Sequence, residues 1–212
     1  MRILATLGCY VVLVASASAQ QPAKNGFATE LPKKVSPEPI PVTVLPAPME
    51  NHRILISTKT YTPQQLLRMD ECELLKIYKC GIASPVPCGY TPGTVIYKPG
   101  TCLAVPGSKM FKFTAWQGKY ITCGTMTNRQ FGVPAIKAAI SDGTSWIDGK
   151  PSLIFDYEDT SLICFRYRDE VREVCPGIYL GCMHRRTKGE PEIAVWFALD
   201  ARKLKGMCPL GK

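Results

Sequence analysis

The stretch AIKAAISDGTSWIDGKPSLIFDY, residues 135–157, decides the expected fold. It begins and ends with short apolar segments, and the dipeptides Asp142-Gly143 and Asp148-Gly149 between them are typical of tight turns. In the first segment, Ile136, Ala138 and Ile140 alternate with other residues, so that they share one face of an extended chain. The pattern predicts antiparallel strands with one buried face.

The same texture continues on both sides of this stretch. Short segments rich in β-branched and aromatic residues follow one another, separated by Gly, Pro, Asn or Asp. No helix-length gaps separate them, which argues against a parallel sheet with crossover helices. We expect strands at Thr94–Lys98, Met110–Ala115, Lys119–Cys123, Thr125–Arg129, Ala135–Ser141, Ser152–Tyr157, Leu162–Arg168, Ile178–Met183 and Ile193–Leu199.

About eight antiparallel neighbours in this length suit a meander that closes on itself, because closure removes exposed sheet edges. The predicted fold class is therefore mainly β, a small antiparallel, lipocalin-like β-barrel over residues 83–205, and a β-sandwich stays open as the alternative. An amphipathic helix is expected over residues 61–82, packed on the barrel. Thr62, Pro63 and Gln65 form its start signal, and Asp70-Glu71 could begin a second, abutting helix.

The N-terminal residues have the composition of a targeting segment. A basic start, an apolar run from Ile3 to Val14 and a small-residue site at Ala17-Ser18-Ala19 predict a signal peptide over residues 1–19 and hence export to the periplasm or medium. Residues 20–60 are rich in proline and predict an extended, disordered linker.

Composition excludes several classes of protein. The chain has 212 residues, of which 46% are hydrophobic and 20% charged, so neither a disordered chain nor a multi-span membrane protein is expected. Cleavage after Ala19 would remove Arg2 and Cys9, which lowers the formal net charge from +9 to +8 and the cysteine count from ten to nine. Export permits disulfides, an odd count leaves one thiol unpaired or joined to another chain, and several cysteines could equally be buried thiols.

A set of motifs resembles a family of exported bacterial proteins without an established activity. The motifs are Trp116-Gln-Gly-Lys119, Asp148-Gly-Lys-Pro151, Arg168-Asp-Glu-Val-Arg-Glu173 with Pro176-Gly-Ile-Tyr-Leu-Gly181, and Phe197-Ala-Leu-Asp200. The chain also resembles lipocalin and calycin barrels through Trp116-x-Gly118. The resemblance implies a barrel, but it supplies no activity and no catalytic residues.

Polar side chains on the expected strands are candidates for binding a ligand. The segment Arg168–Glu173 could form one helical turn, and its guanidinium groups could clamp an anionic head group, although a solvated ion-pair cluster is the alternative. Asp156 follows an apolar strand, and Arg168 is its expected partner. The expected ligand-binding residues are Lys119, Arg129, Trp146, Asp156, Tyr157, Arg168, Glu170, Arg172 and Tyr179.

Metal ions and cofactors are not expected. No Cys-x-x-Cys occurs, and of the two histidines His52 falls in the linker while His184 is expected in a solvated basic turn. Gly-x-Ser-x-Gly is also absent, so enzymatic activity is uncertain and less expected than binding.

The sequence leaves three functions open. The first is an exported barrel that binds a hydrophobic or amphipathic small molecule or an anionic envelope component, since the basic charge suits an anionic membrane or wall surface and export argues against nucleic acid. The second is an envelope scaffold or interaction protein with a solid barrel. The third is an envelope enzyme that uses Asp156, Tyr157 or Glu170 as acid and base groups.

Overall fold

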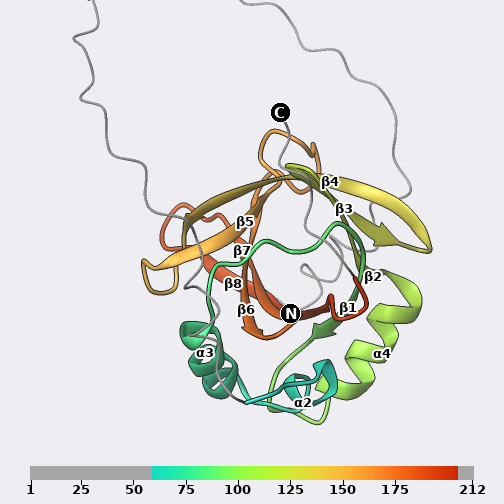
Figure 1. Ribbon diagram of the computed structural model, residues 1–212, viewed down its shortest axis with the longest axis vertical. Helices are drawn as coiled ribbons and strands as arrows, with labels where there is room; N and C mark the ends of the chain where they lie inside the picture. Colours follow the sequence, from blue (N-terminus) through green and yellow to red (C-terminus); the bar gives the residue numbers. More distant parts are fainter. Residues whose placement is uncertain (1–58, 205–212) are drawn as a thin grey trace, which may run out of the picture.

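A computed structural model describes residues 59–204, so the predicted signal peptide and most of the linker lie outside the described residues. Eight antiparallel strands close into a barrel in the order β1-β2-β3-β4-β5-β6-β7-β8, with β1 paired to β8 (Figure 1). The predicted antiparallel barrel is therefore confirmed. The strands are β1 Gly89–Ile96, β2 Trp116–Thr122, β3 Thr125–Gln130, β4 Val133–Thr144, β5 Pro151–Asp156, β6 Tyr167–Cys175, β7 Ile178–Arg185 and β8 Glu192–Asp200.

Within residues 59–204, three helices accompany the barrel, namely α2 Pro63–Leu66, α3 Glu71–Cys80 and α4 Ala104–Thr114, and Figure 1 shows them gathered on one side of it. The expected helix over 61–82 is divided in two, and the possibility of a second start at Asp70 is confirmed. Thr62 and Asp70 each accept a hydrogen bond from the backbone of the third helical residue, Gln65 and Glu73. Two capping boxes in succession fix two short helices instead of one long one.

Two of the expected strands are wrong. Met110–Ala115 lies in helix α4 and the residue after it, where Phe111 is buried and Phe113 is 86% exposed. Most of Leu162–Arg168 is turn, and β6 begins only at Tyr167. The segment expected to form a helical turn, Arg168–Glu173, is instead the body of β6.

Of the two expected turns, one is confirmed and the other is wrong. Asp148-Gly149 lies in the β4–β5 turn as expected, and Gly149 has a positive φ of 69°. Asp142-Gly143 does not form a turn, because β4 continues through it and pairs Asp142 with Leu153.

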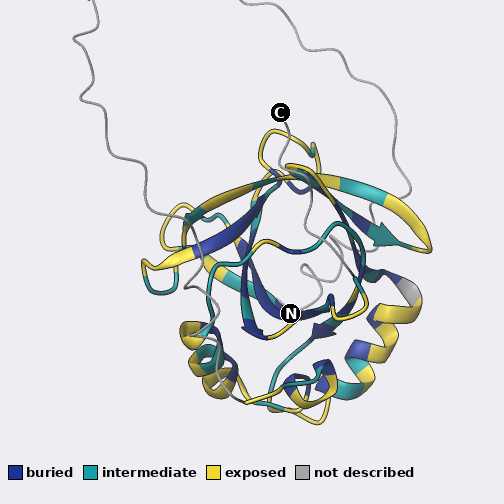
Figure 2. Ribbon diagram, in the orientation of Figure 1, coloured by how far each residue is buried: buried dark blue, intermediate teal, exposed yellow. Residues whose placement is uncertain are grey.

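The hydrophobic core has two parts that share the barrel wall. One fills the barrel interior with side chains such as Phe155, Val171 and Phe197. The other lies between the outer face of the wall and the helices, where Leu66 and Leu74 meet Trp196. Figure 2 shows that strands near the helices are buried, whereas the connections and the outer side of α4 are exposed. Strand β7 is buried from Ile178 to His184 because it contributes to both parts.

Because the strands are antiparallel, successive connections emerge at alternate ends of the barrel. The connections β1–β2, β3–β4, β5–β6 and β7–β8 emerge at one end, and the remaining three emerge at the other. Because the β1–β2 connection contains α4, we call the first end the α4 end. Phe111 and Ala115, at the end of this connection, pack with the interior core.

Candidate functional site

Two clusters of buried polar residues lie back to back on β6. Asp169 and Glu170 are neighbours in a strand, so their side chains point to opposite sides of the barrel wall. Asp169 is 1% exposed and Glu170 is fully buried. We call the residues around them the inner cluster (Lys119, Asn128, Tyr157 and Asp169) and the outer cluster (Tyr78, Glu170, Cys182 and His184).

The inner cluster is centred on a buried ammonium group. Lys119 Nζ lies 2.8 Å from Asp169 Oδ2, 2.9 Å from Asn128 Oδ1 and 3.0 Å from Tyr157 Oη. Tyr157 Oη also donates to Asp169 Oδ2 at 2.8 Å. The three hydrogen-bonding positions of the ammonium group are thereby filled by the protein itself.

Aromatic rings surround the same ammonium group. Lys119 Nζ lies 5.2–5.7 Å from the ring centroids of Trp116, Phe155, Tyr157 and Phe197. Burial lowers the pKa of Lys119, and the carboxylate of Asp169 acts in the opposite direction. The ion pair and the rings replace the water that the charge loses on folding.

A cavity adjoins the inner cluster in the half of the barrel near the α4 end. It is lined by Lys119, Asp169, Trp116 and Met183, among others, and its volume is about 20 Å³. This is room for about one water molecule, because a water needs at least ~10–15 Å³ by this measure. The interior is filled, and a lipid chain does not fit into it as the side chains stand.

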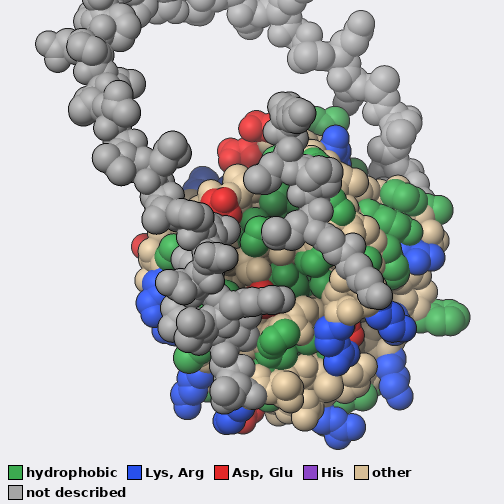
Figure 3. Space-filling model, in the orientation of Figure 1, with side chains coloured by type: hydrophobic (Ala, Val, Ile, Leu, Met, Phe, Trp, Pro, Cys, Tyr) green, Lys and Arg blue, Asp and Glu red, His purple; other side chains and the backbone are tan. Residues whose placement is uncertain are grey.

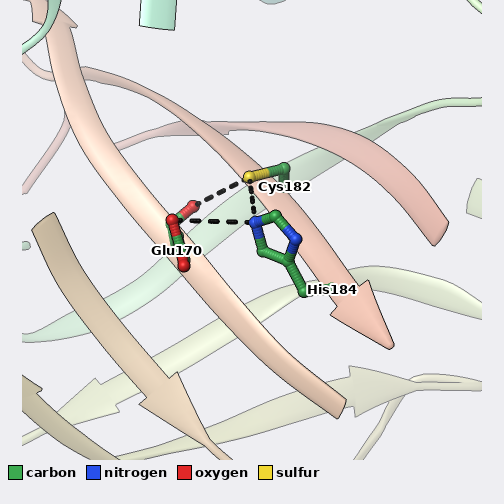
Figure 4. A group of neighbouring side chains, drawn as sticks. All are labelled: Glu170, Cys182 and His184. Atoms are coloured by element: carbon green, nitrogen blue, oxygen red, sulfur yellow. Dashed lines mark hydrogen bonds and ion pairs between the residues drawn. The ribbon is translucent and has the colours of Figure 1, made fainter. Parts of the chain in front are cut away.

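The outer cluster brings three different ligand types to one point (Figure 4). His184 Nε2 lies 3.3 Å from Cys182 Sγ and 3.6 Å from Glu170 Oε2. Tyr78, from α3, donates from its hydroxyl to the same Glu170 oxygen at 3.3 Å. The imidazole Nδ1 of His184 is buried and has no hydrogen-bond partner.

The electrostatics of the outer cluster favour an ionised Glu170 and a neutral Cys182. Burial raises the pKa of Glu170, but hydrogen bonds from His184, Ser145 and the backbone of Trp146 outweigh it, so the net pKa is lowered. Burial raises the pKa of Cys182 well above its ordinary value, and the nearby carboxylates of Glu170 and Asp169 raise it further. Cys182 is therefore a thiol at neutral pH.

The β4–β5 connection covers the outer cluster. The backbone N–H of Trp146 donates to Glu170 Oε1 at 2.8 Å, and the guanidinium of Arg168 lies 4.3 Å from the Trp146 ring centroid and 3.3 Å from the same oxygen. Arg172 holds the connection in place through two hydrogen bonds to Asp148, at 2.7 and 2.8 Å. Four of the predicted binding residues, Trp146, Arg168, Glu170 and Arg172, thus lie together.

The remaining predicted residues are distributed over the molecule. Lys119 and Tyr157 belong to the inner cluster, on the other side of the wall. Arg129 packs on the ring of Tyr90, 4.9 Å from its centroid. Tyr179 donates from its hydroxyl to the carbonyl of Pro85 at 2.8 Å. The nine residues do not line one pocket.

The expected partner of Asp156 is wrong. Its carboxylate accepts hydrogen bonds from Arg186 at 2.6 and 2.8 Å, whereas Arg168 lies opposite it in the strand register and directs its guanidinium to Glu170 and the Thr144 carbonyl. The partner of Asp156 is therefore Arg186, which directly follows β7, and not its register neighbour Arg168.

His184 was also expected in a solvated turn, and this is wrong. It is a residue of β7, 2% exposed, with its ring 5.4 Å from that of Trp146. The signal that could have found the cluster is the spacing Cys182-x-His184, because residues two apart in a strand share a face.

Exposed hydrophobic side chains are concentrated in the connections of the α4 end. Among the described residues, nine large hydrophobic side chains are exposed, and eight of them lie in or directly beside the connections of this end; Trp146 is the exception. Phe113 is 86% exposed and Leu162 is 96% exposed. The eight are Leu103, Met110, Phe113, Phe131, Val133, Leu162, Ile163 and Phe165.

Basic residues accompany these side chains on α4. The exposed Lys109 and Lys112 alternate with Met110 and Phe113 along the helix. Phe131, in the β3–β4 turn, donates from its backbone N–H to the carbonyl of Ala115, which brings this turn to the end of α4. Figure 3 shows hydrophobic and basic side chains on the side of the molecule where α4 and the β3–β4 turn lie.

Acidic residues of the α4 end lie in or directly beside the other two connections, β5–β6 and β7–β8. Glu158 is bonded to Arg186 at 3.3 Å, and Glu192 to Arg185 at 2.6 Å. The α4 side of this end is therefore its basic side.

Comparisons with known proteins assign no family to the chain. No protein-family model matches the chain, and no curated protein matches it. A solved structure described as a protein from Thermomonospora curvata is similar at 17% identity and a TM-score of 0.42, covering 63% of this chain and 88% of that one. Within residues 59–204, no helix has the length and apolar character needed to cross a membrane.

Proposed function

We propose that this protein docks on an anionic lipid surface through the α4 end of its barrel. The observation that carries the proposal is that eight of the nine exposed large hydrophobic side chains of the described residues lie in, or directly beside, connections that emerge at that end. Soluble proteins expose such side chains singly, and a concentration of them is typical of an interaction surface.

The kind of partner follows from the charges between the apolar side chains. Lys109 and Lys112 stand beside Met110 and Phe113 on one face of α4. Side chains of this mixture suit a bilayer interface, where apolar groups enter the acyl boundary and lysines remain at the head groups. Each lysine near an anionic leaflet contributes about 1 kcal/mol. The predicted signal peptide is consistent with a role in the cell envelope.

The filled barrel supports a surface site over an interior one. The cavity of about 20 Å³ has no room for an acyl chain, and the nearby Lys119 is already paired with Asp169. The proposal therefore keeps the expected anionic envelope partner and moves the contact from the interior to the outer rim.

The test is sedimentation of the protein with vesicles. We expect binding to vesicles that contain phosphatidylglycerol, weak binding to pure phosphatidylcholine, and a decrease with added salt because exposed charges are screened. The double variant Phe113→Ser/Leu162→Ser should bind at least about tenfold more weakly, because each buried side chain of this size contributes about 1.5–3 kcal/mol and ~1.4 kcal/mol is a factor of ten.

A matched pair of variants separates charge at the α4 end from charge in general. Lys109→Gln/Lys112→Gln on α4 should weaken binding, and Lys76→Gln/Lys79→Gln, with the same spacing on the exposed side of α3, should not. Equal effects of the two pairs would overturn the proposal. So would tight binding of monomeric dodecanoate without any preference for vesicles, which would indicate a site for single molecules.

A further inference from the structure

We infer that Glu170, Cys182 and His184 form a site for one divalent transition-metal ion of the zinc class, on the outer face of β6 and β7. This inference does not depend on the proposed lipid docking, because the outer cluster is fully buried and its connection, β4–β5, emerges at the opposite end of the barrel. Carboxylate, thiolate and imidazole together are the ligands that Zn²⁺ takes in proteins.

Two of the three distances between the ligand atoms are those expected around one ion. Zinc binds sulfur at about 2.3 Å and nitrogen or oxygen at about 2.0–2.2 Å, so neighbouring ligand atoms of a tetrahedral site are about 3.3–3.6 Å apart. The distances of His184 Nε2 to Cys182 Sγ and Glu170 Oε2 are 3.3 and 3.6 Å. All three ligand atoms lie within 4.8 Å of one another.

The arrangement differs from that of a catalytic cysteine. In a nucleophile–histidine–acid relay, the nucleophile contacts one ring nitrogen and the acid contacts the other. Here Cys182 and Glu170 both contact Nε2 of His184, and Nδ1 has no hydrogen-bond partner. Convergence of two groups on one nitrogen is the geometry of ligands around a shared ion.

Strand geometry explains why the three side chains converge. Cys182 and His184 are two residues apart in β7 and point to the same side. Glu170 is the register partner of Cys182 on β6, so its side chain stands beside them on that side. Tyr78 Oη, 3.3 Å from Glu170 Oε2, supplies a further oxygen next to the position of the ion.

Binding of the ion releases one proton. Glu170 binds as a carboxylate and His184 as a neutral imidazole through Nε2. The proton with which Nε2 bonds Glu170 in the free protein moves to Nδ1, so the ring keeps one proton. The Cys182 S–H bond breaks as the sulfur–metal bond forms, and the proton leaves to solvent, so that the dication is bound by two anionic groups and one neutral group. The affinity should therefore rise with pH.

The test uses Co²⁺ as a coloured probe for the full chain, supplied both to the folded protein and during refolding. We expect one equivalent to give the charge-transfer absorption of a thiolate–cobalt bond, and an equivalent of Zn²⁺ to remove it. Cys182→Ser should abolish this absorption, and His184→Gln and Glu170→Gln should weaken Co²⁺ binding at least about 100-fold, since loss of supporting groups alone costs 10–100-fold.

Two cysteine variants are the controls. Cys175→Ser removes another buried thiol, at the end of β6 and bonded to the backbone of Tyr61, and Cys72→Ser removes an exposed one. Both should keep the absorption. The inference is overturned if Cys182→Ser, folded by circular dichroism, still shows the band, if either control loses it, or if the wild-type protein gives no thiolate absorption under either condition.

Discussion

At the scale of single residues, the molecule is distinguished by charges that are buried on both sides of one strand. Asp169 faces the interior and pairs with Lys119, from a distant part of the chain, and Glu170 faces the helices and pairs with Arg168. Buried ions tolerate the loss of one partner poorly, because the remaining charge is left without water or a counter-ion.

Removal of the interior cation should therefore destabilise the fold strongly. We expect Lys119→Met to lower the free energy of unfolding by about 3–5 kcal/mol, because it leaves the carboxylate of Asp169 buried and unpaired. Lys119→Met/Asp169→Leu should recover part of this loss. Chemical denaturation of the two variants checks it, and a double variant less stable than the single one would contradict the paired-charge interpretation.

Glu170 should make stability depend on pH in the acidic range. Its pKa in the folded protein lies below the ordinary value of 4.5, chiefly because its hydrogen bonds outweigh the effect of burial. A carboxyl group with a lowered folded pKa contributes stability above its unfolded pKa and loses it as the pH falls through the folded pKa. The stability difference between wild type and Glu170→Gln, from denaturation at a series of pH values, should be constant near neutrality and shrink below about pH 4.5.

The candidate residues show how far residue-level prediction reaches. The sequence predicts Lys119, Tyr157, Glu170 and Arg172 as ligand-binding residues, and in the structure all four are buried. The partners were not predictable, because Asp148 reaches Arg172, and Lys119 reaches Asp169, across strands that no local pattern relates.

At the scale of elements, strands with one apolar face were predictable. Segments whose residue spacing suggests a different element, such as α4 and β6, were not. The Phe111 and Phe113 spacing suggested a strand face, yet on a helix residues two apart point about 200° apart, and α4 buries the first and exposes the second. Strand β6 was missed because the run from Arg168 to Glu173 has the charge spacing of a helix. These charged residues form a strand because the residues on each face of β6 have partners, in the inner cluster on one side of the wall and the outer cluster on the other.

The β1–β2 pairing depends on a close backbone approach at Gly118. This residue has φ of 141°, and a Cβ atom there would lie 2.2 Å from the carbonyl oxygen of Thr91. Gly118→Ala should cost about 2–3 kcal/mol in unfolding free energy or more, since both strain and a clash oppose it. Gly132, with φ of 83° and no atom within 4 Å of such a Cβ, is the control, and Gly132→Ala should cost only about 1 kcal/mol. Equal costs would contradict the account of this pairing.

The β4–β5 connection, which covers the outer cluster, is held in place by the guanidinium group of Arg172. Arg172 bonds both carboxylate oxygens of Asp148 and the carbonyls of Pro151 and Lys150. A lysine cannot reproduce these directions, so Arg172→Lys should destabilise the protein by about 1.5–3 kcal/mol. Thermal unfolding measures the loss, and limited proteolysis should cut first within 145–150. An unchanged melting temperature would show that charge alone is sufficient.

At the scale of the whole molecule, the barrel acts as a rigid wall that separates three surroundings. Its interior is closed around Lys119, its helix-covered face buries Glu170 with Cys182 and His184, and its α4 end presents apolar and basic side chains to solvent. The closed antiparallel sheet was predictable from many short strands with turn residues between them. The sorting of exposed apolar residues to one end was not, because it depends on which connections the closed order brings together.

Hydrogen–deuterium exchange in the presence of phosphatidylglycerol vesicles tests the lipid-docking proposal most directly, because it reports on each connection of the unmodified protein. We predict slower exchange at 103–114, 131–133 and 161–166 when vesicles are added, and no change at 71–80 or 145–150. Protection of α3 and the β4–β5 connection instead, or no protection of the three apolar segments under conditions where the protein sediments with the vesicles, would contradict docking through the α4 end.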